Sequence, residues 1–348
     1  MGKPVGFGII GAGMIAEMHA KSIASLDNCR LVGFYDSVPA AAARRAEQFH
    51  CKAYGSFEEF LADPEIEAVT IATPSGAHMD SAVAAADAGK HVFCEKPLDV
   101  TLERVDAIIA ACERNHRLLA PVFQLRFTEP VQLVRRAMQD GRFGKMILAS
   151  AQMRWFRDQD YYGKSSWRGT WKMDGGGALM NQAIHMIDLL LYINGAPVQV
   201  SAMSDTLTHD IEVEDTLCAA VKWANGSYGT IEVSTSCAPG FPRRLEFSGS
   251  GGSVSIEEES ITRWEFVESR PEDEEILRLR RDGGDAKGAS DPRSINQTGH
   301  AYQIRDLADA IRKGTPLLID GREGRRAVEF ICGIYESART GNPYVFGK

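Results

Sequence analysis

Two side chains in the sequence, Lys96 and His185, have the chemistry needed to take a proton from a hydroxyl group and to stabilise the charge that develops there. Lys96 follows the apolar run 91–94 and precedes Pro97, which disfavours a helical backbone at the lysine and makes a cis bond plausible. Its ammonium group would then stand at the carboxyl end of a strand, where open sheets bind ligands. From position alone, Lys96 could equally be a surface lysine paired with Glu95.

His185 stands in the helical segment 178–193, which follows the glycine triplet Gly175–Gly177. An imidazole that titrates near neutral pH is suited to act as the general base toward a hydroxyl. Asn181 lies four residues earlier and therefore on the same helix face, where its amide can orient the ring but supplies no charge. Asp188 follows one turn later. The residue types alone leave a histidine that only packs as the alternative.

A dinucleotide site is indicated near the start of the chain. Gly11 and Gly13 follow the apolar run 5–10, and Met14 and Ile15 lead from them toward a helix-like segment at residues 17–26. The first glycine allows a tight turn, and the second lets a pyrophosphate approach the backbone at the helix N-terminus. We therefore expect these four residues to contact the cofactor.

The acid that such a site requires is Asp36, which closes a second apolar run at residues 31–35. Its carboxylate would accept hydrogen bonds from the ribose hydroxyls of the adenosine. Ser37 follows, without an adjacent lysine or arginine, so a 2′-phosphate would meet like charge. The sequence therefore predicts NAD as the cofactor and makes NADP less favoured.

Other polar and aromatic residues follow strands or lie in the glycine-rich loop 158–177. Those expected to contact the cofactor are Thr73, Pro74, His78, Glu95, Lys96, Gln124, Trp167 and Arg168. Those expected to contact the substrate are Lys96, Arg126, Tyr162, Asn181 and His185. Two alternatives stay open, since His78 could cap a helix and the aromatic residues could fill a domain interface. No cluster of His, Asp or Cys has the spacing of metal ligands, so no metal is expected.

Helical patterns alternate with short apolar runs over residues 1–125, which predicts a Rossmann domain with a doubly wound parallel sheet. Residues 126–348 are expected to form the substrate-binding and oligomerisation domain, an α+β fold with an open antiparallel sheet and helices. Asn225-Gly226 predicts a hairpin in that sheet. The closing helices, at about 299–313 and 322–340, are expected to pack back on the first domain.

The charged segment 268–291 is expected to be a mobile excursion of undefined role. The whole chain of 348 residues has a net charge of −8 and no basic block, which argues against nucleic acid or an anionic membrane as a partner. The start of the chain leaves no room for a signal peptide, and seven scattered cysteines suggest reduced thiols, so a cytoplasmic protein is expected. An apolar face left open by the sheet would pair subunits into a homodimer or homotetramer.

Taken together, these motifs resemble the Gfo/Idh/MocA family, the relatives of glucose–fructose oxidoreductase and inositol dehydrogenase. The resemblance covers nearly the whole chain and rests on the Gly11 turn, Thr73-Pro74 with His78, Glu95-Lys96-Pro97, and the segment from Gly175 to Asp188. It implies NAD(P) in the first domain and a sugar, polyol or sugar derivative on the second.

The resemblance also implies that Lys96 is the catalytic lysine and His185 the catalytic histidine. Asn181 stands where inositol-type members carry an aspartate, which is more similar to the branch that acts on nucleotide sugars or other modified sugars. The segment from Trp167 to Trp171 resembles the same kind of branch and is expected to reach the nicotinamide end.

The function expected from these residues is NAD-dependent oxidation of a ring secondary alcohol to a keto-sugar. One alternative is a UDP-sugar 3-dehydrogenase, for which the diphosphate would be held by arginines, the candidates being Arg126, Arg154, Arg157 and Arg168. An alternative of another class is a cofactor-binding sensor without turnover. Loss of the catalytic pair would mark such a sensor, and both Lys96 and His185 are present.

Overall fold

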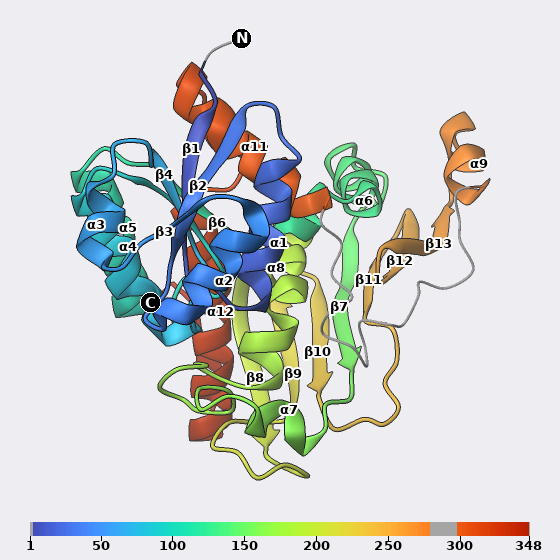
Figure 1. The fold of residues 1–348 in the computed structure, drawn as a ribbon. Helices are drawn as coiled ribbons and strands as arrows, with labels where there is room; N and C mark the ends of the chain where they lie inside the picture. The colour runs from blue at the N-terminus through green and yellow to red at the C-terminus, as the bar shows by residue number, and fades with distance from the viewer. Residues whose placement is uncertain (1–2, 279–297, 348) are drawn as a thin grey trace. The chain divides into compact units, whose positions relative to one another are not determined.

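The computed structural model describes residues 3–278 and 298–347, which fall into two compact units (Figure 1). Of these residues, 3–124 and 298–328 form unit 1, and 125–278 and 329–347 form unit 2. Within the described ranges, no helix is both long enough and apolar enough to cross a membrane.

Unit 1 is built on a six-stranded sheet in the order β3-β2-β1-β4-β5-β6, and every neighbouring pair is parallel. The strands are β1 (Val5–Ile10), β2 (Cys29–Tyr35), β3 (Lys52–Ala53), β4 (Ala68–Ile71), β5 (His91–Cys94) and β6 (Leu119–Pro121). The order reverses between β1 and β4, as in a doubly wound Rossmann sheet. The predicted fold of this part of the chain is confirmed.

The helices of unit 1 follow the strands in the expected alternation. They are α1 (Met14–Ala24), α2 (Pro39–Phe49), α3 (Phe57–Ala62), η1 (Ser75–Ala77), α4 (His78–Asp87), α5 (Leu102–Arg114) and α11 (Thr298–Lys313). Although α11 comes late in the sequence, its Ile304, Leu307 and Ala308 belong to the same buried core as β1 and α1. Gln303 of α11 also accepts a hydrogen bond from the backbone N–H of Phe123 at 2.9 Å.

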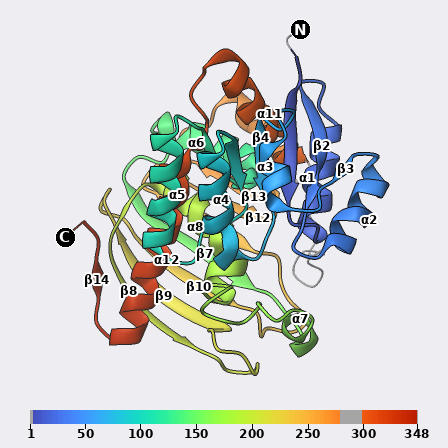
Figure 2. The ribbon, with the colours of Figure 1, turned by 60° about the vertical axis from the view of Figure 1, so that its left-hand side comes forward.

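Unit 2 contains an eight-stranded sheet in the order β13-β12-β11-β7-β10-β9-β8-β14 (Figure 2). The strands are β7 (Met146–Arg154), β8 (Pro197–Asp205), β9 (Thr216–Trp223), β10 (Tyr228–Ser234), β11 (Arg244–Gly249), β12 (Gly252–Glu257), β13 (Ser260–Phe266) and β14 (Tyr344–Val345). The predicted hairpin is confirmed, because β9 and β10 pair in antiparallel fashion around Asn225-Gly226. Side chains of β9 alternate between buried and exposed, as a sheet with one covered face requires.

The expected antiparallel sheet is confirmed at every pair but one, because β7 runs parallel to β10. β7 lies between β10 and β11 and is antiparallel to β11. The alternation of apolar residues records which face of a strand is buried, but not which strand lies beside it. A sequence pattern of period two could therefore not reveal this mixed pairing.

The remaining helices are η2 (Gln124–Phe127), α6 (Glu129–Gln139), α7 (Gln159–Gly163), η3 (Ala178–Ala183), α8 (Ile184–Asn194), α9 (Pro271–Arg278) and α12 (Gly321–Thr340). The part of α12 from Glu329 onward belongs to unit 2, where Ser337 accepts a hydrogen bond from Ala202 of β8 at 3.1 Å. The segment 268–291, expected to be a mobile excursion, forms helix α9 in its described part. Asp273 of α9 is held by both Arg142 and Trp264, and residues 279–291 lie outside the described residues.

Candidate active site

The glycine turn after β1 has the geometry that a dinucleotide pyrophosphate needs. Gly11 adopts φ +97°, and a Cβ there would lie 2.6 Å from the carbonyl oxygen of Ala72. Gly13 is the N-cap residue of α1, no side chain caps the helix, and the space around the glycine is open. Unpaired N–H groups at a helix N-terminus attract anions, so this turn fits a pyrophosphate.

Asp36 lies beside the same turn. One of its carboxylate oxygens accepts a hydrogen bond from the N–H of Ala12 at 2.7 Å, and the other accepts one from Val38 at 2.8 Å. A carboxylate has about four lone-pair sites, so acceptor capacity remains for ribose hydroxyls. Arg45 of α2, which the sequence gave no reason to single out, donates to the carbonyl of Gly13 at 3.1 Å and thus holds the turn from its other side.

Two of the predicted cofactor contacts, Thr73 after β4 and Gln124 after β6, offer further polar groups. The Thr73 hydroxyl and the Gln124 side-chain oxygen are buried, and neither has a hydrogen-bond partner within the described ranges. The ring nitrogens of His78, in contrast, have partners within unit 1. They face the carbonyl oxygens of Pro97 at 2.8 Å and Thr73 at 3.0 Å. Carbonyls only accept and a neutral imidazole has one N–H, so the buried His78 ring donates to one of these two strand-end segments and lies against the other. Direct contact between His78 and a cofactor stays a prediction.

Lys96 lies directly after β5, and the cis Lys96–Pro97 bond considered at the sequence level is present. Glu95 turns its carboxylate into the interior of unit 1, where it lies 2.9 Å from the Nε2 atom of His19 and 3.8 Å from that of His300. Its other oxygen accepts the backbone N–H of Lys96 at 3.1 Å. Although burial raises the pKa of Glu95, the hydrogen bond with His19 and the nearby ring of His300 hold it well below its usual range.

His19, Glu95 and His300 place one ligand atom each within 4.8 Å of one another, a grouping that sequence spacing could not reveal. The Nδ1 atoms of both histidines are buried and have no partner among the described residues. A histidine bound to a metal almost always donates its second N–H to an acceptor, so this arrangement favours direct hydrogen bonds to the carboxylate. The cluster ties α1, the end of β5 and α11 together behind Lys96.

In unit 2, the helical segment that carries Asn181 and His185 is not the regular α-helix expected from the sequence. The first six residues form a π-helix, η3, and His185 is the second residue of the α-helix that follows, α8. Single π turns inside helices occur frequently at functional sites. The wider turn arises where other parts of unit 2 bind the first N–H groups of η3, among them the Glu214 side chain.

The Asn181 side chain is oriented from both ends. Its amide nitrogen donates to Asp174, whose second oxygen accepts the N–H of Gly169 at 2.9 Å. Its amide oxygen accepts from Gln182 at 2.6 Å, and Gln182 also donates to the Tyr161 hydroxyl at 2.9 Å. Asp174 and Gln182 are thus positioning groups that residue spacing did not identify.

Arg126 and Tyr162, predicted to contact substrate, are both buried in unit 2. Arg126 donates to the two oxygens of Asp188 at 2.8 and 2.5 Å, and the Tyr162 hydroxyl lies 3.0 Å from that of Thr235. Substrate contact by either residue stays a prediction.

Of the other arginines considered for a diphosphate, Arg154 pairs with Glu232 and Arg157 donates to Gln182. Arg168 packs its guanidinium 4.8 Å from the centres of the Tyr161 and Trp167 rings.

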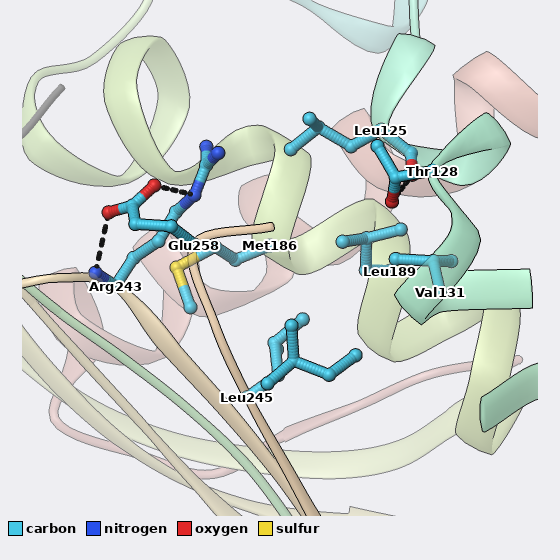
Figure 3. Close-up of a pocket in the computed structure, with 9 residues that line it drawn as sticks. Leu125, Thr128, Val131, Met186, Leu189, Arg243, Leu245 and Glu258 are labelled. Carbon is cyan, nitrogen blue, oxygen red and sulfur yellow. Dashed lines mark hydrogen bonds and ion pairs between the residues drawn. The ribbon is translucent and has the colours of Figure 1, made fainter. Parts of the chain in front are cut away.

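Unit 2 also contains a small pocket (Figure 3). It is lined by Leu125, Thr128, Val131, Met186, Leu189, Arg243, Leu245, Ile256 and Glu258. The Arg243–Glu258 ion pair, at 2.9 Å, stands at one side, and the remaining lining is mostly apolar. None of the predicted site residues lines it, so we regard it as a packing hollow between helices and sheet.

Comparison with known proteins identifies both parts of the chain. Residues 5–123 match the family described as "Oxidoreductase family, NAD-binding Rossmann fold", and residues 131–255 match the "GFO/IDH/MocA C-terminal domain". The inositol 2-dehydrogenase of Rhizobium meliloti is 30% identical over 332 residues, which cover 93% of this chain and 94% of that protein.

Two solved structures are similar over almost their full length. The WlbA dehydrogenase of Bordetella pertussis, in complex with NADH and UDP-GlcNAcA, has a TM-score of 0.91 and 32% identity and covers 99% of each chain. The WlbA dehydrogenase of Chromobacterium violaceum, with the same two ligands, has a TM-score of 0.90 and 32% identity, covering 99% of this chain and 97% of that one. With its NAD-binding Rossmann sheet and its matching C-terminal domain, the chain belongs to the Gfo/Idh/MocA family of oxidoreductases.

Proposed function

We propose that the protein is an NAD-dependent dehydrogenase that oxidises a ring secondary alcohol of a sugar, polyol or sugar derivative to a ketone. The observation that carries the proposal is the uncapped N-terminus of α1 beside Gly13 and Asp36, in a chain that also supplies Lys96 and His185. Sugar and polyol dehydrogenases among the relatives, including inositol 2-dehydrogenase and levoglucosan dehydrogenase, support the substrate class.

In this mechanism the bound NAD supplies the hydride acceptor. His185 takes the proton of the reacting hydroxyl as general base. Lys96 donates a hydrogen bond to the same oxygen and stabilises the charge that develops on it. Asn181, held by Asp174, keeps His185 and a neighbouring substrate hydroxyl in place.

The cofactor contacts that we propose comprise the turn, the ribose acid and the strand ends. They are Gly11, Gly13, Met14, Ile15, Asp36, Ser37, Thr73, Pro74, His78, Glu95, Lys96 and Gln124 from unit 1, with Trp167 and Arg168 from unit 2. The buried, unpartnered oxygens of Thr73 and Gln124 support their inclusion, since a buried polar atom needs a partner. For the substrate we propose Lys96, Arg126, Tyr162, Asn181 and His185.

A panel of sugars and polyols, assayed with NAD and with NADP, tests this function. We expect reduction of NAD with at least one member, and tighter binding of NADH than of NADPH, because Asp36 repels a 2′-phosphate. Fluorescence titration measures the binding preference independently of the substrate. Tighter binding of NADPH would contradict the role of Asp36, and absence of turnover with every sugar and sugar nucleotide would favour the sensor.

A nucleotide-sugar dehydrogenase is the second candidate, favoured by the two similar structures that contain UDP-GlcNAcA and by Asn181. A diphosphate or uronate carboxylate requires a cation, and Arg168 is half-buried, with a buried Nε atom that has no partner among the described residues. Arg168 is therefore the arginine that we propose for this contact.

Addition of UDP-GlcNAcA should raise the melting temperature of the wild-type protein, and Arg168→Ala should reduce that shift. Arg263→Ala is the matched control, since Arg263 is exposed and pairs with Glu265. An equal shift in wild type and Arg168→Ala would show that Arg168 does not contact the nucleotide sugar. No shift in wild type would count against a nucleotide-sugar substrate.

We further propose a cytoplasmic location and a homodimer or homotetramer that pairs through the sheet of unit 2. Exposed apolar side chains on that sheet support the pairing, among them Leu148, Met203 and Tyr228. Light scattering that gives the mass of one chain would contradict it.

A further inference from the structure

The start of helix η3 is held by groups from two other elements of unit 2. A helix begins with N–H groups that have no partner inside the helix. Here Gly177 and Leu179 each donate to a Glu214 carboxylate oxygen at 2.8 Å, and Ala178 donates to the Glu214 carbonyl at 3.0 Å. Met180 donates to the Tyr335 hydroxyl at 3.2 Å. Four successive N–H groups are therefore bound by only two residues.

The two residues are also bound to each other. The Tyr335 hydroxyl donates to the same Glu214 oxygen that accepts from Leu179, at 2.8 Å. The Tyr335 ring meets Trp171 edge-on, with 5.3 Å between ring centres. Because Glu214 precedes β9 and Tyr335 lies on α12, this contact joins the sheet, the last helix and the start of η3.

This contact explains two glycines of the triplet, Gly176 and Gly177. A Cβ on Gly177 would lie 1.8 Å from the Glu214 carbonyl oxygen, and a Cβ on Gly176 would lie 2.1 Å from the Tyr335 hydroxyl. Gly176 also has φ +154°, which other residues rarely adopt. The glycines are therefore required by the close approach of Glu214 and Tyr335.

The pKa values of Glu214 and its neighbour Asp215 are shifted in opposite directions. Burial raises the pKa of Glu214 to about 7. Although burial also acts on Asp215, hydrogen bonds from the N–H groups of Leu207 and Thr208 keep its pKa well below the usual range. The titratable groups that act most strongly on this pair are the two residues themselves and Asp174, which acts on Tyr335, and η3 carries no charged side chain.

Protonation of Glu214 would disturb this arrangement. The two N–H groups of η3 and the O–H of Tyr335 all donate to its carboxylate oxygens. A neutral carboxyl accepts hydrogen bonds more weakly than a carboxylate, because the charge that strengthens the three contacts is lost. The N-terminal turn of η3 would then be held less tightly.

We propose that Glu214, as a carboxylate, and Tyr335 are positioning residues that fix the π turn of η3 and thereby the places of Asn181 and His185. This role rests on the proposed function, in which those two side chains act on the substrate. Loosening η3 would displace both groups together, and small displacements from the reactive geometry are costly in rate. Activity should therefore rise with pH as Glu214 ionises.

Tyr335→Phe removes one donor to Glu214 and keeps the ring. We expect kcat to fall about tenfold, with the Kd for NADH unchanged. Loss of a donor to the carboxylate also raises the pKa of Glu214, so the acid limb of the kcat profile should move up by about one pH unit. Tyr302→Phe, at an exposed tyrosine of α11, is the control and should change neither.

Wild-type kcat and an unmoved acid limb in Tyr335→Phe would overturn the proposal. A second readout needs no substrate, because Trp171 contacts Tyr335. Tryptophan fluorescence of the wild type should titrate near pH 7, and Glu214→Gln should abolish that titration. Its absence in the wild type would also overturn the proposal. If the fluorescence titrates near pH 7 but no sugar of the panel is turned over, the role of Glu214 in holding η3 would be supported and the proposed function would be contradicted.

Discussion

Replacement of His185 by alanine should lower kcat on the true substrate by about 10²–10⁴-fold, the range typical for loss of a general acid–base group. The imidazole takes the hydroxyl proton in the proposed reaction, and no other residue in that mechanism takes its place. The cofactor contacts that we propose include Trp167 and Arg168 of unit 2 but not His185, which is a residue of α8. The Kd for NADH should therefore stay close to that of the wild type.

Steady-state kinetics and an NADH titration measure the two quantities on the same preparations. His116→Ala is the matched control, since His116 lies in the turn after α5 and has no part in the proposed reaction. A His185→Ala enzyme that retains near wild-type kcat would show that another group takes the proton. A large loss of NADH affinity together with kcat would instead indicate a general structural defect.

Replacement of Lys96 by methionine should lower kcat by about 10²–10³-fold, the range measured for removal of one donor to a developing oxyanion. Methionine keeps much of the length of the side chain but cannot donate a hydrogen bond or carry charge. Lys96→Arg restores the charge with a planar fork in place of a compact ammonium, so it should recover only part of the rate.

The control for Lys96 is Lys313→Met, at the exposed end of α11. The comparison of interest is kcat rather than KM, because the proposed contact strengthens as the oxygen becomes negative. If Lys96→Met raised only KM and left kcat unchanged, Lys96 would bind the substrate without stabilising the transition state.

Much of unit 1 could be predicted from the sequence because its signals are local. Glycine turn, apolar strand and acid follow one another within about 30 residues at Gly11, Gly13 and Asp36, and the backbone needs those residue types there. Period-two alternation likewise located the strands of unit 2. The parallel pairing of β7 with β10 could not be predicted from the sequence, because strand order is set by contacts between distant segments.

The residues that support the candidate site were missed for the same reason. Glu214 acts through the N–H groups of η3, and Tyr335 lies 155 positions from the N–H of Met180 that it accepts. His19 and His300 meet Glu95 from opposite ends of the chain. A sequence pattern identified the side chains with suitable chemistry, Lys96, Asn181 and His185, but not the groups that hold them in place.

The contribution of α11 to the core of unit 1 has a consequence for synthesis of the protein. Residues 1–124 leave the ribosome 174 positions before α11 begins, since 298 − 124 = 174. At about 5–20 residues per second, that interval lasts about 9–35 s. During it the nascent cofactor domain lacks Ile304, Leu307 and Ala308 from its core and His300 from the side of Glu95. The domain that comes first along the chain is therefore completed only after most of unit 2 has been made.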